Sequence, residues 1–320
     1  MNIAPKLDSI LVARRTLTGA PLNRFTPENS MLKKLAALVL LAFSATAAIA
    51  VPLGSQSVLV VEDGTGKILL EKNPDTVVPI ASLTKLMTAM VVLDSKPDMD
   101  APISIDKVDV DMLKHSASRV PVGATIPRRD VLQLALMSSD NRAAASLART
   151  YAGGPTAFAV ALNAKLKALG MTHTSIEEPT GLSPHNRSTA SDLIKMATAA
   201  SQYPDIRRIT TDPKDMITIN GRKVEYHNTN RLVGAKGWDI GLSKTGYTDE
   251  AGRCLIMRIK AAGHNATLVL LNAKANSARV LDAWNIRRLV ASGDDQEEAS
   301  VEAPVVTKHH KHHRKHPAQA

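Results

Sequence analysis

The feature that most constrains the fold is a change of hydrophobic period along the chain, from strand-like near both ends to helical in the middle. Residues 55–61 and 67–70 are rich in β-branched side chains and flank a Gly-rich turn, which predicts a hairpin. Further strands are expected at 242–244, 253–261 and 266–272. Apolar residues recur at intervals of three and four in the stretches between. Helices are expected from Ser82 onward, at about 128–137, 140–151, 155–169 and 189–200, and lastly at 277–292.

Strands near both ends predict a mixed α+β fold. The simplest assembly is one antiparallel sheet formed by both ends, covered by helices, with a helical lobe inserted between the strands. Gly170 is placed to end the helix expected at 155–169, and Thr189 or Ser191 to cap the one expected at 189–200. A cleft between sheet and lobe is where a functional site is expected.

Residues 31–50 have the pattern of a secretory signal peptide. Lys33 and Lys34 precede a short apolar stretch, and Ala48-Ile49-Ala50 supplies the small residues of a cleavage site. We therefore expect export to the periplasm and a mature chain that begins near Val51. Residues 1–30 show no periodicity and are interpreted as a non-native or disordered extension that precedes the natural start.

The net charge of +10 is concentrated at the chain ends, since residues 51–300 contain 30 basic and 27 acidic residues. Nucleic-acid binding is therefore not expected. We expect a catalytic domain over 51–293 and a disordered basic, His-rich tail over 294–320, without a stable membrane anchor. The single cysteine, Cys254, cannot form a disulfide within the chain and is expected to be a packed thiol. No metal site or cofactor is expected.

Three short motifs carry the expected chemistry. In chain order they are Ser82-Leu83-Thr84-Lys85, Ser139-Asp140-Asn141 and Lys244-Thr245-Gly246. Each is common by chance, and any one of these residues alone is more simply a cap, turn or surface residue. Their order, with a serine at a helix start and the last motif in a strand, is the pattern of class A β-lactamases and penicillin-binding proteins.

The first motif matches what a serine nucleophile needs. A serine hydroxyl attacks well only when a base removes its proton, and Lys85 lies one helical turn from Ser82. Lysine acts as a base only when neutral, so its pKa must be lowered by burial or by a nearby cation, for which Lys244 is the candidate.

The other residues have expected supporting roles. Ser139 can relay a proton to the leaving amine, and Asn141 can hold Lys85 and bind a substrate amide. Lys244 and Thr245 can bind a substrate carboxylate, while Gly246 lets the substrate backbone approach the strand. The backbone N–H groups of Ser82 and Tyr247 are the expected oxyanion hole.

Residues 55–292 resemble the low-molecular-mass penicillin-binding D-alanyl-D-alanine peptidases. The likeness extends to the nucleophile segment 78–89, the middle loop Glu178-Pro179-Thr180-Gly181-Leu182-Ser183 and the approach to the third motif, 228–232 and 238–248. The continuation through 250–255 is most similar to the endopeptidase group of penicillin-binding protein 7 type. The resemblance implies a β-lactamase-like or DD-peptidase-like fold, peptidoglycan stem peptides as substrate and covalent inhibition by β-lactams.

The endopeptidase group implies cleavage of D-Ala–diaminopimelate cross-links. Carboxypeptidase relatives commonly carry a further β-rich domain and a membrane-binding helix, whereas only a short basic tail is expected here. D-alanyl-D-alanine carboxypeptidase activity remains the alternative, because one grip on the carboxylate could serve both substrates. Oligomeric state and regulatory partners are left open.

Two other functions are weighed. A class A β-lactamase needs a carboxylate for the deacylating water, and Glu177 and Glu178 lie at about the right sequence distance, but in a peptidase-like loop. An inactive wall-binding scaffold is disfavoured by the intact catalytic set.

Overall fold

The computed structural model describes residues 53–293, so the expected extension at 1–30, the signal peptide at 31–50 and the tail at 294–320 lie outside the described residues. The strands are β1 (Ser57–Glu62), β2 (Ile68–Lys72), β3 (Val78–Pro79), β4 (Pro102–Ser104), β5 (Thr125–Pro127), β6 (Arg187–Ser188), β7 (Lys214–Ile219), β8 (Arg222–His227), β9 (Asp239–Thr248), β10 (Gly252–Ala261) and β11 (His264–Ala273). The helices are the 3₁₀ turns η1 (Ala81–Leu83) and η2 (Lys107–Asp109) together with α2 (Thr84–Asp94), α3 (Arg128–Leu136), α4 (Asn141–Arg149), α5 (Gly154–Ala168), α6 (Ala190–Ala200), α7 (Pro204–Thr211) and α8 (Asn276–Ser292).

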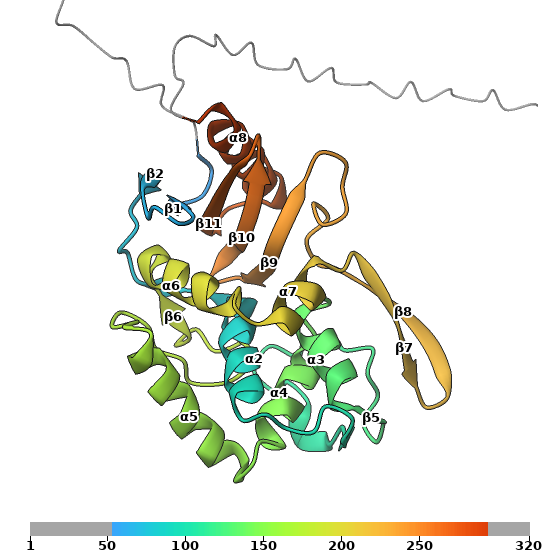
Figure 1. Cartoon of the computed structure of the whole chain (residues 1–320). Coiled ribbons are helices and arrows are strands. Elements are labelled where there is room, and N and C mark those ends of the chain that lie inside the picture. The colour runs from blue at the N-terminus through green and yellow to red at the C-terminus, as the bar shows by residue number, and fades with distance from the viewer. Residues whose placement is uncertain (1–52, 294–320) are drawn as a thin grey trace, which may run out of the picture. The chain divides into compact units, whose positions relative to one another are not determined.

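Strands from both ends of this region form one antiparallel sheet, in the order β2-β1-β11-β10-β9 (Figure 1). The first strand pairs with the last, from Ser57 opposite Leu271 to Glu62 opposite Ala266. The predicted mixed α+β architecture is thereby confirmed. The third motif lies in β9, at the edge of the sheet, where a row of backbone groups has no strand partner within the sheet.

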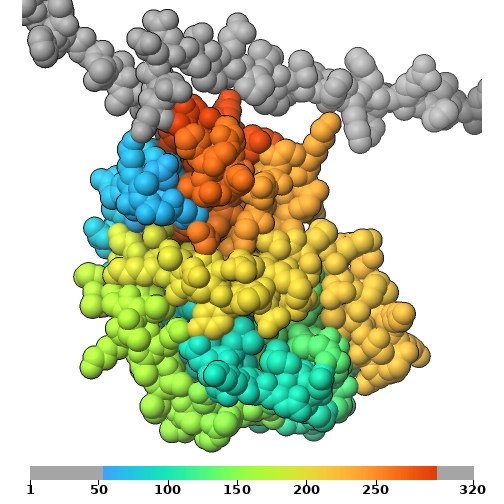
Figure 2. All heavy atoms as spheres, in the orientation of Figure 1, coloured from blue at the N-terminus to red at the C-terminus, as the bar shows by residue number. Residues whose placement is uncertain are grey.

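Alternating side chains bury the two faces of the sheet separately. Val58 and Val60 belong to the core that packs against α8, whereas Leu59 belongs to the larger core shared with the helical lobe. Helix α6 contacts β1 and β11 on this second side. In Figure 2, residues of α6 and α7 form the yellow band between the sheet and the lobe. Cys254 is fully buried in the larger core, and burial raises the pKa of its thiol to about 11.

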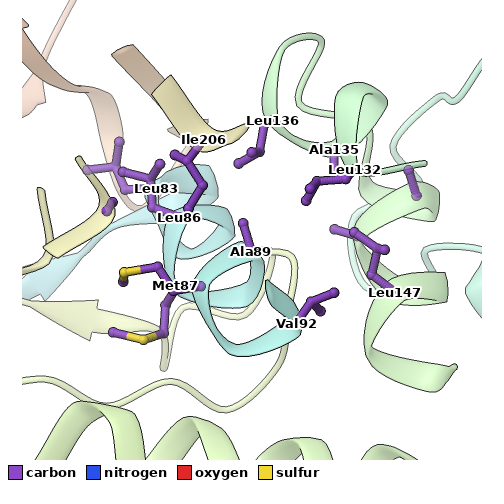
Figure 3. Packing of buried hydrophobic residues seen from close by; sticks show 14 of the residues in the cluster. Leu83, Leu86, Met87, Ala89, Val92, Leu132, Ala135, Leu136, Leu147 and Ile206 are labelled. Carbon is purple, nitrogen blue, oxygen red and sulfur yellow. The ribbon is translucent and has the colours of Figure 1, made fainter. Parts of the chain in front are cut away.

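Helix α2 runs through the middle of the lobe and is apolar on nearly all sides, as expected of a central helix. Figure 3 shows its side chains Leu86, Ala89 and Val92 among residues of α3, α4 and α7. The cap expected at Thr189 is present, since its hydroxyl accepts a hydrogen bond from the backbone N–H of Asp192 at 3.1 Å. The residues that carry the site are therefore mounted on a closely packed element. Among residues 53–293, no helix has the length and apolar character needed to cross a bilayer.

Several elements differ from the expectation. Helix α7 and the hairpin β7–β8 lie in a region for which we expected neither, although Asn220-Gly221, at φ of 51° and 77°, is a strong sequence signal for a two-residue hairpin turn. The helix expected from Ser82 begins at Thr84, because residues 81–83 form a 3₁₀ turn. Strand β9 is also longer than the three residues expected for it.

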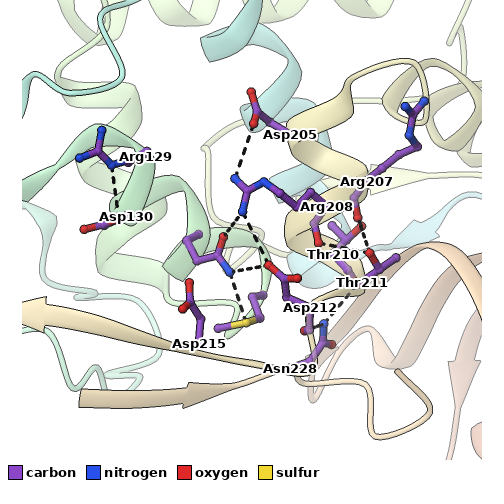
Figure 4. Close-up of polar contacts among 12 residues, drawn as sticks. Arg129, Asp130, Asp205, Arg207, Arg208, Thr210, Thr211, Asp212, Asp215 and Asn228 are labelled. Carbon is purple, nitrogen blue, oxygen red and sulfur yellow. Dashed lines mark hydrogen bonds and ion pairs between the residues drawn. The ribbon is translucent and has the colours of Figure 1, made fainter. Parts of the chain in front are cut away.

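Polar contacts join α7 to the segment that follows the hairpin (Figure 4). Arg208 forms an ion pair with Asp212 at 3.7 Å, and Asn228 donates its Nδ2 to the backbone oxygens of Thr210 and Asp212 at 3.1 and 3.0 Å. The next residue, Thr229, is thereby positioned beside β9.

Candidate active site

Ser82 lies on a tight turn pressed between two glycines. Ala81, directly before it, has a left-handed φ of 48°. A Cβ at Gly181 would lie 2.0 Å from the carbonyl oxygen of Ala81, and one at Gly246 would lie 2.9 Å from that of Ile80. Both contacts exclude a larger residue, because real Cβ atoms essentially never approach that closely. Gly246 therefore also accommodates the backbone of this turn, a close approach that the sequence analysis did not foresee.

Lys85 lies one turn along the chain from Ser82, as predicted, and is 1% exposed. Its Nζ is 2.8 Å from Ser82 Oγ, 2.6 Å from Asn141 Oδ1 and 2.6 Å from the carbonyl oxygen of Thr180. Three acceptors therefore hold the amino group beside the hydroxyl that it would deprotonate.

Burial dominates the electrostatics of this lysine. Desolvation lowers the pKa of Lys85 from 10.5 to about 8, although the carboxylates of Glu178, Asp140 and Asp111 oppose the shift. A substantial fraction of the side chain is thus neutral at mildly alkaline pH, which a general base requires.

The second motif lies at the start of α4. Asp140 caps the helix by accepting from the backbone N–H of Ala143 at 2.9 Å, and this directs Asn141 toward Lys85. Ser139 has a left-handed φ of 60°, a strained conformation for a serine. Its Oγ accepts from Lys244 Nζ at 2.8 Å, so the structure brings Ser139 to the lysine of β9.

The third motif presents a second buried lysine. Lys244 is also 1% exposed, and its Nζ donates to Ser139 and to the carbonyl oxygen of Thr245 at 3.0 Å. Burial, followed by repulsion from Lys85 and Arg279, holds the pKa of Lys244 well below its ordinary value. Burial thus lowers the pKa of Lys85, as expected, and the repulsion between the two lysines contributes to the lowered pKa of Lys244.

The remaining residues line the cleft along β9. Thr245 Oγ1 donates to Thr229 Oγ1 at 2.6 Å. A Cβ at Gly246 would lie 3.1 Å from the backbone nitrogen of Ser82, so the residue that follows, Tyr247, belongs to the strand segment beside the nucleophile. Its ring is half-exposed and stacks against the Arg253 guanidinium, 3.5 Å from the ring centroid.

A cavity of about 190 Å³ adjoins this group on the lobe side. Asn141, Thr180 and Leu182 form its inner wall, and the loop that carries Met112 and Leu113 forms its outer wall. The cavity thus reaches Asn141 and Thr180, two of the residues that contact Lys85.

Comparison with known proteins agrees with this arrangement. The family model described as D-alanyl-D-alanine carboxypeptidase matches residues 43–275. The chain belongs to this family. The D-alanyl-D-alanine endopeptidase of Pseudomonas aeruginosa is 49% identical over 243 residues, which is 75% of this chain and 78% of that protein. That of Escherichia coli K12 is 44% identical over 252 residues, covering 78% of this chain and 81% of that protein.

More distant members agree in fold. The Streptomyces K15 DD-transpeptidase superposes with a TM-score of 0.69 at 27% identity, over 74% of this chain and 97% of that one. The carboxypeptidase DacF of Bacillus subtilis is 30% identical over 233 residues, covering 70% of this chain and 59% of that protein. The resemblance read from the sequence is thus confirmed, and the chain is a serine peptidase of this family.

Some residues of this peptidase site escaped the sequence analysis. Thr180 contributes a backbone carbonyl, which no side-chain motif reveals. Ser116 accepts from Asn141 Nδ2 at 2.8 Å and so orients that amide. Arg279, 7% exposed in α8, is a further buried cation that acts on Lys244. Its position in a predicted amphipathic helix looks like that of an ordinary surface arginine, so only the fold identifies it.

Proposed function

We propose that the chain is a D-alanyl-D-alanine endopeptidase whose nucleophile is Ser82 and whose general base is Lys85. The observation that carries the proposal is the 2.8 Å contact between Lys85 Nζ and Ser82 Oγ, made by a lysine that is buried and has a lowered pKa. A serine beside such a base is the arrangement that forms an acyl-enzyme.

In the proposed acylation, Ser82 Oγ bonds to the carbonyl carbon of a D-alanyl residue while its proton passes to Lys85. The amide C–N bond then breaks, and Lys85 gives up this proton to the departing amine by way of the Ser139 hydroxyl, which Lys244 holds in place by a hydrogen bond. Water completes the cycle by hydrolysing the ester. Asn141 holds Lys85 and binds a substrate amide.

Two further groups of contacts are proposed for the substrate. The backbone N–H groups of Ser82 and Tyr247 stabilise the oxyanion, because the two segments approach closely at Gly246. Lys244 and Thr245 bind the carboxylate of the departing residue. An incoming carboxylate would raise the pKa of Lys244, since it places a negative charge beside a buried ammonium.

The proposed substrate is the D-Ala–diaminopimelate cross-link of peptidoglycan, because the relatives of highest identity given above are named endopeptidases. D-alanyl-D-alanine carboxypeptidase activity is the alternative. The same contacts of Lys244 and Thr245 with a carboxylate would serve the cross-link and the terminal D-Ala–D-Ala bond alike. A β-lactamase is less well supported, because both oxygens of Glu178 already accept hydrogen bonds from backbone N–H groups of its own loop.

Digestion of purified sacculi tests this assignment. We expect the wild type to convert cross-linked dimers to monomers and Ser82→Ala to leave them intact, with the products identified by mass. Loss of a terminal D-Ala without loss of dimers would instead establish the carboxypeptidase alternative. No change in either product would support an inactive wall-binding scaffold.

The proposal includes covalent labelling of Ser82 by β-lactams and export to the periplasm through a signal peptide at 31–50. It is supported by the extracytoplasmic setting of cell-wall peptidases. N-terminal sequencing of the exported protein should begin near Val51, and a first residue well before Val51 would contradict cleavage there.

A further inference from the structure

Glu178 has no role in the proposed reaction, yet its carboxylate is surrounded by donors. It lies at the start of the loop that supplies the Thr180 carbonyl to Lys85. Six groups donate to its two oxygens: Thr180 N–H (2.7 Å), the Thr180 hydroxyl, Gly181 N–H (2.6 Å), Leu182 N–H (2.8 Å), Ser183 N–H (3.3 Å) and Asn186 Nδ2 (3.0 Å). A carboxylate so occupied fixes the path of the backbone around it.

These six donors form a cage around the Glu178 carboxylate. The cage sets the direction of one backbone carbonyl, that of Thr180. In a trans peptide, the C=O of one residue and the N–H of the next point in opposite directions. Glu178 takes the N–H of Gly181, so the C=O of Thr180 in the same peptide unit points away from Glu178 and toward Lys85 Nζ, 2.6 Å away.

The Thr180 carbonyl determines the direction of the lone pair of Lys85. Neutral lysine has two N–H hydrogens and one lone pair, whereas its three partners differ in kind. The Thr180 carbonyl and Asn141 Oδ1 can only accept, so they take the two hydrogens. The lone pair is left facing Ser82 Oγ, the one partner that has a proton to give.

We infer that Glu178 is a positioning residue of the peptidase reaction, acting through the Thr180 carbonyl to hold the lone pair of Lys85 toward Ser82. The inference rests on the proposed roles of Ser82 and Lys85. It explains why a partly buried glutamate faces the backbone N–H groups of the loop that contacts Lys85.

Removing this carboxylate should also change the protonation of Lys85. The charged groups that act on it are Glu178 from the loop, Asp140 from the start of α4, Asp111 from the loop before β5, and Lys244 from β9. Of these, the carboxylates raise the pKa of Lys85. Loss of Glu178 should therefore lower it and move the acid limb of the rate profile to lower pH.

The experiment measures acylation by a fluorescent penicillin from pH 5.5 to 9.5 in four full-length proteins. These are the wild type, Glu178→Gln, Glu178→Asp and Glu177→Gln. In Glu178→Gln the new amide N–H₂ must face backbone N–H donors. Glu178→Asp keeps the charge but is one methylene too short to reach all six donors. Glu177 is the matched control, because it is the exposed neighbour of Glu178. Among residues 53–293, its carboxylate accepts a hydrogen bond only from the Ser183 hydroxyl.

We expect the plateau rate of Glu178→Gln to fall about tenfold or more, and its acid limb to move to lower pH. Glu178→Asp should have an intermediate plateau rate with an acid limb close to that of the wild type, because it keeps the charge, and Glu177→Gln should match the wild type on both readouts. The pH midpoint of the acid limb does not depend on how much of the enzyme is folded. It can therefore be measured even for a variant that folds poorly. If Glu178→Gln yields no folded protein, the acylation rate constant of Glu178→Asp decides: a value equal to that of Glu177→Gln would overturn the inference.

Three results would overturn the inference. A Glu178→Gln profile equal to that of Glu177→Gln would show no role. A lower rate with an unmoved limb in Glu178→Gln would show a purely structural role. Unchanged acylation with blocked deacylation would make Glu178 a hydrolytic base. Failure of the wild type itself to be labelled would instead refute the proposed function.

Discussion

The two sides of the cleft each bury a lysine, but in opposite surroundings. On the lobe side, Lys85 has three hydrogen-bond acceptors, and carboxylates lie near enough to favour its charge. On the sheet side, Lys244 has Lys85 and Arg279 as the charged groups acting on it, and both disfavour its charge. The comparison teaches that burial alone does not assign a role. The lobe holds one lysine in a fixed direction for proton transfer, whereas the sheet leaves the other short of a negative partner, which a substrate carboxylate can supply.

The largest expected effect comes from removing the lobe lysine. Lys85→Met should lower the rate of acylation by about 10² to 10⁴-fold at every pH, because no other group hydrogen-bonded to Ser82 can act as a base. Stopped-flow labelling with penicillin measures this rate, and Lys195→Met, a half-exposed lysine of α6, serves as the control. A loss below tenfold would break the distinction between the two sides.

The turn that carries Ser82 can be tested through stability. Gly181→Ala should destabilise the fold by about 4 kcal/mol, because alanine at a φ of +89° is strained and its Cβ would collide with the Ala81 carbonyl. Gly64→Ala is the matched control, since it has a φ of +91° with nothing within 4 Å, and should cost about 1–2 kcal/mol. Equal losses in denaturant unfolding would mean that the close approach contributes nothing.

Removing the sheet lysine should have a smaller effect of another kind. Lys244→Met should lower the efficiency of cleavage by about 10 to 100-fold, the value of one charge-assisted hydrogen bond, and mainly through KM. Steady-state kinetics on a cross-linked dipeptide measure both constants. A substrate in which the carboxylate next to the scissile bond is amidated should lose this difference between wild type and variant. A pure loss of kcat would place Lys244 in proton transfer instead.

The pH dependence of the wild type sharpens the same contrast. The base works when Lys85 is neutral, so the acylation rate should be highest above its pKa of about 8 and fall as the pH drops below it. The decline should approach tenfold per pH unit. Penicillin acylation rates between pH 6 and 9.5 would show this limb. A rate that kept rising toward pH 10.5 would indicate a lysine whose pKa is not lowered.

The sequence predicted what depends on local pattern, and missed what depends on backbone direction and distant approach. The five strands of the main sheet, most helices and the pairing of both ends followed from hydrophobic period. The positions of Ser82, Lys85 and Asn141 followed from motif order, and these three side chains do meet. The Thr180 carbonyl could not be predicted, because its direction depends on a carboxylate cage that forms only in the folded loop.

The errors have physical reasons of the same kind. The close packing of Gly246 was missed, because the sequence does not reveal that β9 packs against residues 80–82. Burial and the Lys244 charge were expected together to lower the pKa of Lys85, but the sequence reveals neither how complete the burial of Lys85 is nor the carboxylates that oppose the shift. Helix α7 was missed although Pro204 stands at its first turn, a favourable position for proline.

The central claim is that Ser82 is the nucleophile, and covalent labelling tests it most directly. Wild type and Ser82→Ala are incubated with a penicillin and examined by intact-protein and peptide mass spectrometry. The account predicts one penicillin per wild-type molecule, attached to the peptide that contains Ser82, and none on the variant. Labelling of Ser82→Ala to the same extent, or no labelling of the folded wild type, would contradict it.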